Sequence, residues 1–206
     1  STRIPPRRPI GKYRYHEDQG VEIYVGNLLN DPQLQAFFTY AWGEDHLLYY
    51  LHQAYANDFL VIKLPRVTEL EDPIEISQDV KDGPLFTTIL VVAEANTKAN
   101  IVLQKSSSAE GQILVSDDIR IIAKENSKIE FVTIQDLNNQ ATNFQKRKAE
   151  CAKDSFVHWI DLCMGSSYTK SDVVSLLKEQ GATSNIKVLF LGSNEQQFDL
   201  FTAAYH

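Results

Sequence analysis

The stretch LFTTILVVAEANTKANIVLQ, residues 85–104, places two runs of β-branched and aliphatic residues on either side of a short polar segment. Runs of this composition, separated by Asn, Thr, Ala and Lys, are typical of β-strands joined by a tight corner. The same pattern recurs from residue 57 to the end of the sequence. It predicts that this part of the chain is built from short strands.

Eleven segments carry the pattern and are predicted strands: 59–64, 73–77, 85–93, 100–104, 112–116, 119–123, 128–135, 155–163, 171–177, 185–192 and 196–205. Residues 138–150 lack it, so we expect a helix or a longer loop there. Asp117 and Asp118 fall between two of the runs, where a solvated corner is expected.

Two features favour one β architecture over the others. All seven prolines lie at or before Pro84, and proline cannot donate to a ladder that is paired on both sides. No Asn-Gly or Asp-Gly hairpin turn separates the predicted strands, since Asp82-Gly83 is followed by Pro84. Both observations favour a parallel β-solenoid over a meander or a Greek key. The corner spacing drifts, so no strict short repeat is expected.

Residues 1–56 differ from the rest and are predicted to form an extended arm followed by helices, with the solenoid occupying 57–206. Residues 1–15 contain five basic and no acidic residues. Asp31-Pro32 can begin a helix over 31–41. A second helix is expected after Gly43, because apolar residues recur there at helical spacing and predict one buried stripe: Leu47, Leu48, Leu51, Ala54 and Tyr55.

Charge and composition exclude several classes of function. Twenty Lys and Arg residues against 27 Asp and Glu residues give a formal net charge of -7. This charge disfavours nucleic acid or an anionic membrane as the main partner, so the basic arm is interpreted as a solvated lead-in. The start, STRIPPRRPI, lacks the apolar region of a signal peptide, which predicts a cytoplasmic location.

Both cysteines lie in KAECAKDSFVHWIDLCMGS, residues 148–166, with His158 between them. Side chains alternate along a strand, so His158 and Cys163 are expected on opposite faces, and the spacing does not supply the four ligands of a zinc site. Cys163 is predicted to be a small buried hydrophobic residue. Cys151 is predicted to be the more exposed and more reactive thiol, because nearby lysines would lower its pKa.

Sequence motifs for catalysis are absent. There is no G-x-S-x-G, no G-x-x-x-x-G-K-[ST] and no G-x-G-x-x-G, so neither a nucleophile elbow nor a phosphate-binding loop is predicted. One enzymatic alternative stays open, since β-helix polysaccharide lyases and hydrolases use carboxylates on one face of the coil. No catalytic residue and no metal ligand is assigned from the sequence.

Four segments together resemble the SufB/SufD family, the scaffold proteins of the Suf iron–sulfur cluster assembly system. They run in the family's order: NDFLVIKLPRVTELEDPIEI (57–76), TTILVVAEANTKANIVLQKSSS (87–108), IRIIAKENSKIEFVTIQDLN (119–138) and VSLLKEQGATSNIKVLFLGSNEQQFDLFTAAYH (174–206). The resemblance implies a right-handed parallel β-helix that dimerises with a SufB/SufD-type paralogue or with itself. It also implies a SufC-like ATPase partner, a transient iron–sulfur cluster in the full complex, and a scaffold that is not itself an enzyme.

The stretch KRKAECAKDSFVHW, residues 146–159, resembles the SufB segment in which Lys-Arg and a cysteine precede a Ser-Trp strand. This places Cys151 on that cysteine, as a sulfur or iron ligand. A further SufB cysteine falls near Ser175 here, a difference that favours SufD or a divergent paralogue. The family continues beyond the position of His206 with more coils and a helical SufC-binding end, so the resemblance implies that this chain corresponds to the first part of the scaffold.

Overall fold

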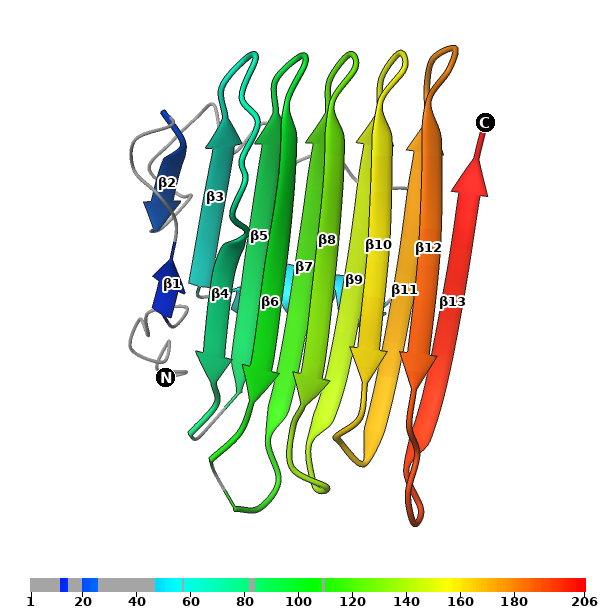
Figure 1. Ribbon diagram of the computed structural model, residues 1–206. Helices are drawn as coiled ribbons and strands as arrows, with labels where there is room; N and C mark the ends of the chain where they lie inside the picture. The colour runs from blue at the N-terminus through cyan, green and yellow to red at the C-terminus, as the bar shows by residue number, and fades with distance from the viewer. Residues whose placement is uncertain (1–11, 15–19, 26–46, 57, 82–83, 109) are drawn as a thin grey trace.

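The computed structural model describes residues 12–14, 20–25, 47–56, 58–81, 84–108 and 110–206. In these residues the chain forms two facing sheets of stacked strands, with a single helix against the outer face of one sheet (Figure 1). The predicted helix at 31–41 and most of the predicted arm lie outside the described residues. The predicted boundary at residue 57 stays a prediction.

Each coil of the chain contributes one strand to each sheet. In spatial order, sheet A contains β1 (Lys12–Arg14), β4 (Ile74–Asp79), β6 (Lys98–Ser106), β8 (Lys128–Asp136), β10 (Phe156–Cys163) and β12 (Thr183–Phe190). Sheet B contains β13 (Gln197–Tyr205), β11 (Tyr168–Leu177), β9 (Thr142–Cys151), β7 (Leu114–Ala123), β5 (Leu85–Ala93), β3 (Asp58–Leu64) and β2 (Glu22–Val25). The helix is α2 (Leu47–Tyr55).

The strands from β3 to β13 pair in parallel with the strand one coil away, whereas β1 and β2 join the first coil as antiparallel edges. In Figure 1, sheet B runs upward at the back and sheet A downward at the front while the chain advances from left to right, which is a right-handed coil. The predicted parallel β-solenoid is confirmed. Its repeat is irregular, since the paired residues Thr142 and Tyr168 are 26 positions apart and Lys98 and Lys128 are 30 apart.

A residue in the left-handed conformation recurs along one side of the solenoid, in the corners that lead from each strand of sheet B to the next strand of sheet A. It is Val67 (φ 63), Asn96 (φ 60), Asn126 (φ 54), Asp154 (φ 54) and Gly181 (φ 76) in successive coils. The first four donate their backbone N–H to a carbonyl of the next corner, in the pairs Val67–Ala95, Asn96–Glu125, Asn126–Lys153 and Asp154–Gln180. Asn, Asp and Gly tolerate this conformation, which explains the polar corners that the sequence predicted.

Val67 is the exception in this series, because a β-branched side chain is strained at positive φ and Val67 is 74% exposed. Replacing Val67 by asparagine is expected to raise the free energy of unfolding by about 1 kcal/mol, since the strain is relieved and no buried contact is lost. Asn96→Val at the equivalent corner is the control, and it should lower the free energy because it also removes the 2.8 Å bond between Asn126 and Asn96. Urea denaturation measures both; a loss of stability in Val67→Asn would contradict the account.

The apolar core lies between the sheets, on the side of the coil nearest these corners. It consists of inward-facing aliphatic residues stacked in rows, such as Leu60, Ile89 and Ile119, together with Phe131 and Trp159. The rings of Phe131 and Trp159 lie 5.6 Å apart, and both residues are fully buried. This stacking of like residues in neighbouring coils holds the parallel strands in register.

Three sequence-based expectations about the elements are wrong, two of them in sheet B. Residues 142–151 form strand β9, not the helix or loop expected over 138–150. Strand β7 (Leu114–Ala123) joins residues 114–116 of the first run to the run 119–123, so Asp117 and Asp118 lie in its middle and not at a corner. Both predictions failed for the same reason: polar residues occupy inward positions at which apolar residues were expected. These buried polar residues are Asp117, Asn143, Gln145 and Arg147.

The second predicted helix is confirmed as α2, but its predicted buried stripe is wrong. Leu47 is 79% exposed and Tyr55 is 49% exposed, whereas His52 is the buried residue of the helix. The helix faces polar groups of sheet B, so hydrogen bonds and aromatic contacts orient it in place of an apolar stripe.

Candidate functional site

The far side of the solenoid interior, away from the apolar core, is polar and charged. Lys105 of β6 donates to Asp117 of β7 and, at 3.1 Å, to Asn143 of β9. Arg147 of β9 bonds Asp161 of β10 at 2.5 Å, and their side chains are 0% and 1% exposed. We call these five residues the interior polar layer; burial raises the pKa of Asp161 and lowers that of Lys105, while the partner charges oppose both shifts.

Asp117 and Asp118 do not act as a pair of carboxylates. Asp117 points into the coil toward Lys105, whereas Asp118 points outward and bonds Arg120 at 2.6 Å. Both are 2% exposed. Each carboxylate is therefore paired with its own cation, and the two cations lie on opposite sides of the sheet.

Cys151 is the last residue of β9 and is fully buried, so the expected exposure is wrong. Its side chain belongs to the apolar cluster that also contains Ala123, Ala149 and Val157. Burial raises the pKa of this thiol to about 11; a hydrogen bond with Ser155 opposes the rise, and the charge of Glu150 adds to it. The expected lowering of the pKa by nearby lysines is therefore wrong too. The assignment of Cys151 as a sulfur or iron ligand stays a prediction.

The predicted alternation along β10 is confirmed by burial. Val157, Trp159, Asp161 and Cys163 are buried, and Cys163 is 1% exposed. His158 lies on the outer face, where its Nδ1 is 2.9 Å from Glu130. The described residues contain no group of three or more His, Cys, Asp or Glu side chains that could hold a metal ion. The apparent Cys-His-Cys arrangement therefore does not converge on one point.

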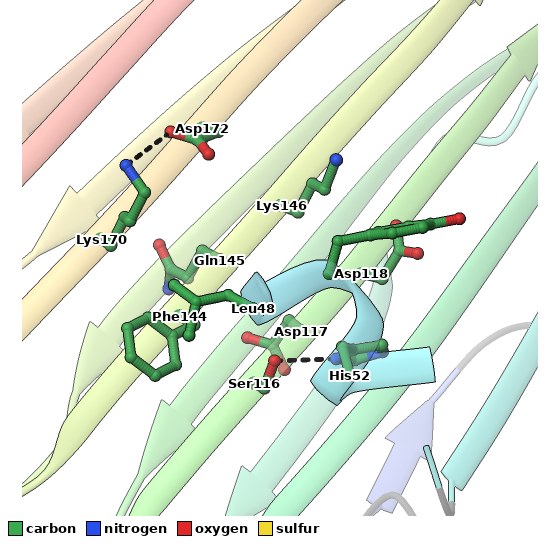
Figure 2. Close-up of a pocket in the computed structure, with 11 residues that line it drawn as sticks. Leu48, His52, Ser116, Asp117, Asp118, Phe144, Gln145, Lys146, Lys170 and Asp172 are labelled. Atoms are coloured by element: carbon green, nitrogen blue, oxygen red, sulfur yellow. Dashed lines mark hydrogen bonds and ion pairs between the residues drawn. The ribbon is translucent and has the colours of Figure 1, made fainter. Parts of the chain in front are cut away.

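The outer face of sheet B holds a second polar site, beneath α2 (Figure 2). The two ring nitrogens of His52 lie 2.8 Å from Ser116 Oγ and 3.0 Å from Thr88 Oγ1. A cavity of about 40 Å³ adjoins them and is lined by side chains of α2, β7, β9 and β11, among them Lys146 and Lys170. No sequence feature pointed to this site beyond the presence of one histidine, His52, in an otherwise amphipathic helix.

Burial lowers the pKa of His52 below its ordinary value of 6.5; Asp118 and Asp117 oppose this shift, while Arg120 and Lys146 add to it. Because its pKa is lowered, His52 binds fewer protons in the folded state than in the unfolded chain. Its contribution to the stability of the folded state is therefore fully present above pH 6.5 and is lost as the pH falls below that value. We expect the docking of α2 to weaken below pH 6.5 in the native chain, and His52→Gln to remove this part of the pH dependence. Hydrogen exchange of α2 amides between pH 8 and pH 5 measures both; equal profiles would contradict the assignment.

Sheet edges form the third feature. In the described residues, β12 and β13 have a hydrogen-bonded neighbour on one side only. The large apolar residues exposed there are Leu189, Phe190, Leu191, Phe201 and Tyr205. The rings of Phe190 in β12 and Phe198 in β13 lie 5.5 Å apart. An unpaired ladder beside exposed aromatic residues is a surface suited to a further strand.

The described residues form a parallel β-solenoid with a partly polar interior. Comparison with known families shows to which family this solenoid belongs. Residues 76–206 match the model of the family described as SUF system FeS cluster assembly, SufBD core domain, and the chain belongs to this family. The resemblance seen in the sequence is therefore confirmed. Among individual proteins, the iron-sulfur cluster assembly protein SufD of Bacillus subtilis (strain 168) is 24% identical over 167 residues, which cover 79% of this chain. The match spans 38% of the length of that SufD.

No helix in the described part of the chain is both long and apolar enough to cross a bilayer.

Proposed function

We propose that this chain is a non-catalytic scaffold subunit of iron–sulfur cluster assembly in the cytoplasm, acting with a SufC-like ATPase. The observation that carries the proposal is the match of residues 76–206 to the SufBD core family, in a chain that folds as a right-handed parallel coil. The relative named SufD supports the same role. The cluster itself is the cargo of the assembly, handed on after it has formed.

The open edge of β12 and β13 supports a partner of the same architecture. A strand from a SufB/SufD-type paralogue, or from a second copy, would satisfy the free backbone groups and cover Phe190 and Phe201. A further coil of a longer chain would meet the same requirement, since the match covers 38% of the SufD relative. The edge is therefore where pairing should be tested first.

Co-expression of the full chain with a SufC-type ATPase and a SufB/SufD-type paralogue tests the proposal. We expect the subunits to co-purify as one complex, as measured by light scattering after size-exclusion chromatography. Leu189→Asp should release the paralogue, because it places a charge on the exposed edge; Val67→Asp, at an exposed apolar residue of the first coil, is the matched control. A wild-type chain that elutes without either partner would contradict the proposal.

The ligand role of Cys151 is part of the same proposal and follows from the family resemblance. Because the thiol is buried in the apolar core, it can bind iron or sulfur only after local opening of the coil. Cys151→Ala should then lower the iron content of the assembled complex without changing its subunit composition. An unchanged iron content would remove Cys151 from the proposal.

A further inference from the structure

The outer face of sheet A carries apolar residues at positions where a solvated sheet carries polar ones. Strands β6, β8 and β10 pair in parallel and in register, so their outward side chains form rows across the sheet. Two neighbouring rows are aliphatic and half-buried: Val102, Val132 and Ile160 in one row, and Ile134 and Leu162 in the next. We call these five residues the sheet A patch.

No described helix or strand lies over the sheet A patch. In Figure 1, sheet A is the front sheet, whereas α2 lies behind sheet B. Parallel sheets usually have both faces covered, and strands that are apolar on both faces are typical of that arrangement. Polar residues of the flanking strands border the patch, with Glu75 of β4 on one side and Lys187 of β12 on the other. An apolar centre with a polar rim is the usual anatomy of a binding surface.

A groove of about 760 Å³ adjoins the sheet A patch at the end where the strands finish, and Ile134 belongs to both. Asp79 and Asp136, the last residues of β4 and β8, line this groove. Lys81 and Lys105 also line it, but the ammonium group of Lys105 is held inside the coil by the interior polar layer. Two carboxylates therefore face one lysine, and the groove attracts a positive charge.

The opposite end of the same face carries the opposite charge. Lys98 and Lys128 are the first residues of β6 and β8 and are paired side by side in register. Both are exposed, and Lys98 also forms a 2.7 Å ion pair with Glu69. The charge along the face thus changes from positive to negative, with the sheet A patch between the two ends. Because the N-terminus is the positive end of a helix dipole, a helix that runs antiparallel to the strands matches both ends.

We propose that this face binds an amphipathic α-helix of another protein. The apolar side of the helix packs on the sheet A patch, its basic N-terminal half lies over the groove, and its acidic C-terminal half lies beside Lys128. The nine residues of β8 span about 30 Å, which is the length of a helix of about 20 residues. This inference goes beyond the proposed function and does not rest on it.

A synthetic helix that carries only this pattern is the probe. It has about 20 residues, leucines at i, i+3, i+4 and i+7 spacing, lysines at the polar positions of its first half and glutamates at those of its second half. Its net charge is near zero, so the formal charge of -7 on the chain does not attract it as a whole. We expect the full chain to bind this peptide with a dissociation constant below about 100 µM, measured by fluorescence anisotropy. A peptide of the same composition with its leucines scattered around the helix should not bind. Equal binding of both peptides, or no binding of the first, would overturn the proposal.

Two substitutions locate the binding on this face. Ile160→Glu puts a charge in the centre of the sheet A patch and should weaken binding by about tenfold or more. Asp136→Asn removes one carboxylate of the groove, so it should weaken binding by about threefold and reduce its dependence on salt. Leu176→Glu is the matched control for Ile160→Glu, since Leu176 is also half-buried but points outward from sheet B. It should bind the peptide like the wild type.

Circular dichroism checks that each variant is folded, and Asp136→Asn provides the test if Ile160→Glu is not. A folded Ile160→Glu variant with unchanged affinity, or an equal loss in Leu176→Glu, would contradict the assignment of this face. Unchanged affinity and salt dependence in Asp136→Asn would contradict the role of the groove.

A second copy of the chain is the other occupant that an apolar face can bind. Light scattering after size-exclusion chromatography of the wild type and of Ile160→Glu distinguishes the two, and we expect the same mass for both. A wild-type dimer that Ile160→Glu converts to a monomer would assign the face to self-association and overturn the proposal. These experiments use no ATPase or paralogue, so their failure is distinguishable from failure of the proposed function.

Discussion

Replacing Arg147 by leucine is expected to lower the free energy of unfolding by about 3–5 kcal/mol, one of the two largest effects in this chain. The Arg147 and Asp161 side chains are 0% and 1% exposed and form a 2.5 Å ion pair inside the coil. Removing the guanidinium leaves the Asp161 carboxylate buried without its cation, which is far more costly than losing a solvated pair. The urea midpoint, followed by the fluorescence of buried Trp159, measures the effect.

Two controls separate burial of charge from loss of contacts. The double substitution Arg147→Leu with Asp161→Leu should recover most of the lost stability, because no unpaired charge is left in the interior. Lys153→Met removes an exposed pair with Glu125, whose side chains are 53% and 60% exposed, and should cost less than about 1 kcal/mol. A double variant as unstable as the single one would show that packing, and not the isolated charge, dominates.

Replacing Gly165 by alanine is expected to destabilise the fold by about 3 kcal/mol or more. A Cβ atom at Gly165 would lie 2.0 Å from the carbonyl oxygen and 2.3 Å from the nitrogen of Leu137 in the neighbouring coil. Both contacts are with backbone, so the clash can be relieved only by separating two coils. The bonds that Gly165 and Met164 donate to Gln135 would be disturbed as well.

Gly111→Ala is the matched control for this substitution. Gly111 has φ +104 and nothing within 4 Å of its would-be Cβ, so alanine there carries backbone strain of about 1–2 kcal/mol and no clash. The comparison isolates close approach of the backbone from conformational strain. Thermal unfolding followed by circular dichroism measures both variants, and equal losses of stability would contradict the packing explanation.

The sequence predicted the fold because most strands bury aliphatic residues. Strand β5 was predicted with its observed bounds, and parity along β10 correctly assigned His158 and Cys163 to opposite faces. The absence of proline after Pro84 agrees with strands that are paired on both sides through most of the coil. These features follow from local composition and from the period of two in a strand.

The polar interior could not be predicted by the same rule. Strand β9 was missed because its inward residues Asn143, Gln145 and Arg147 look like those of a solvent-exposed segment. Their partners, Lys105 and Asp161, are distant in sequence and come together only through the stacking of coils. The exposure predicted for Cys151 was wrong because residues 152–155 form a tight corner directly after it, and the thiol ends strand β9 in the interior of the coil.

The central claim is that this chain takes part in iron–sulfur cluster assembly. Its most direct test is the anaerobic reconstitution of the full chain, co-expressed with a SufC-type ATPase and a SufB/SufD-type paralogue, followed by assay of iron and acid-labile sulfide and by visible absorption spectroscopy. The account predicts a complex that contains this chain and binds iron and sulfide together, with the charge-transfer absorption of an iron–sulfur cluster. A complex that forms but gains neither iron nor sulfide, or a cluster that assembles equally well when this chain is omitted, would contradict it.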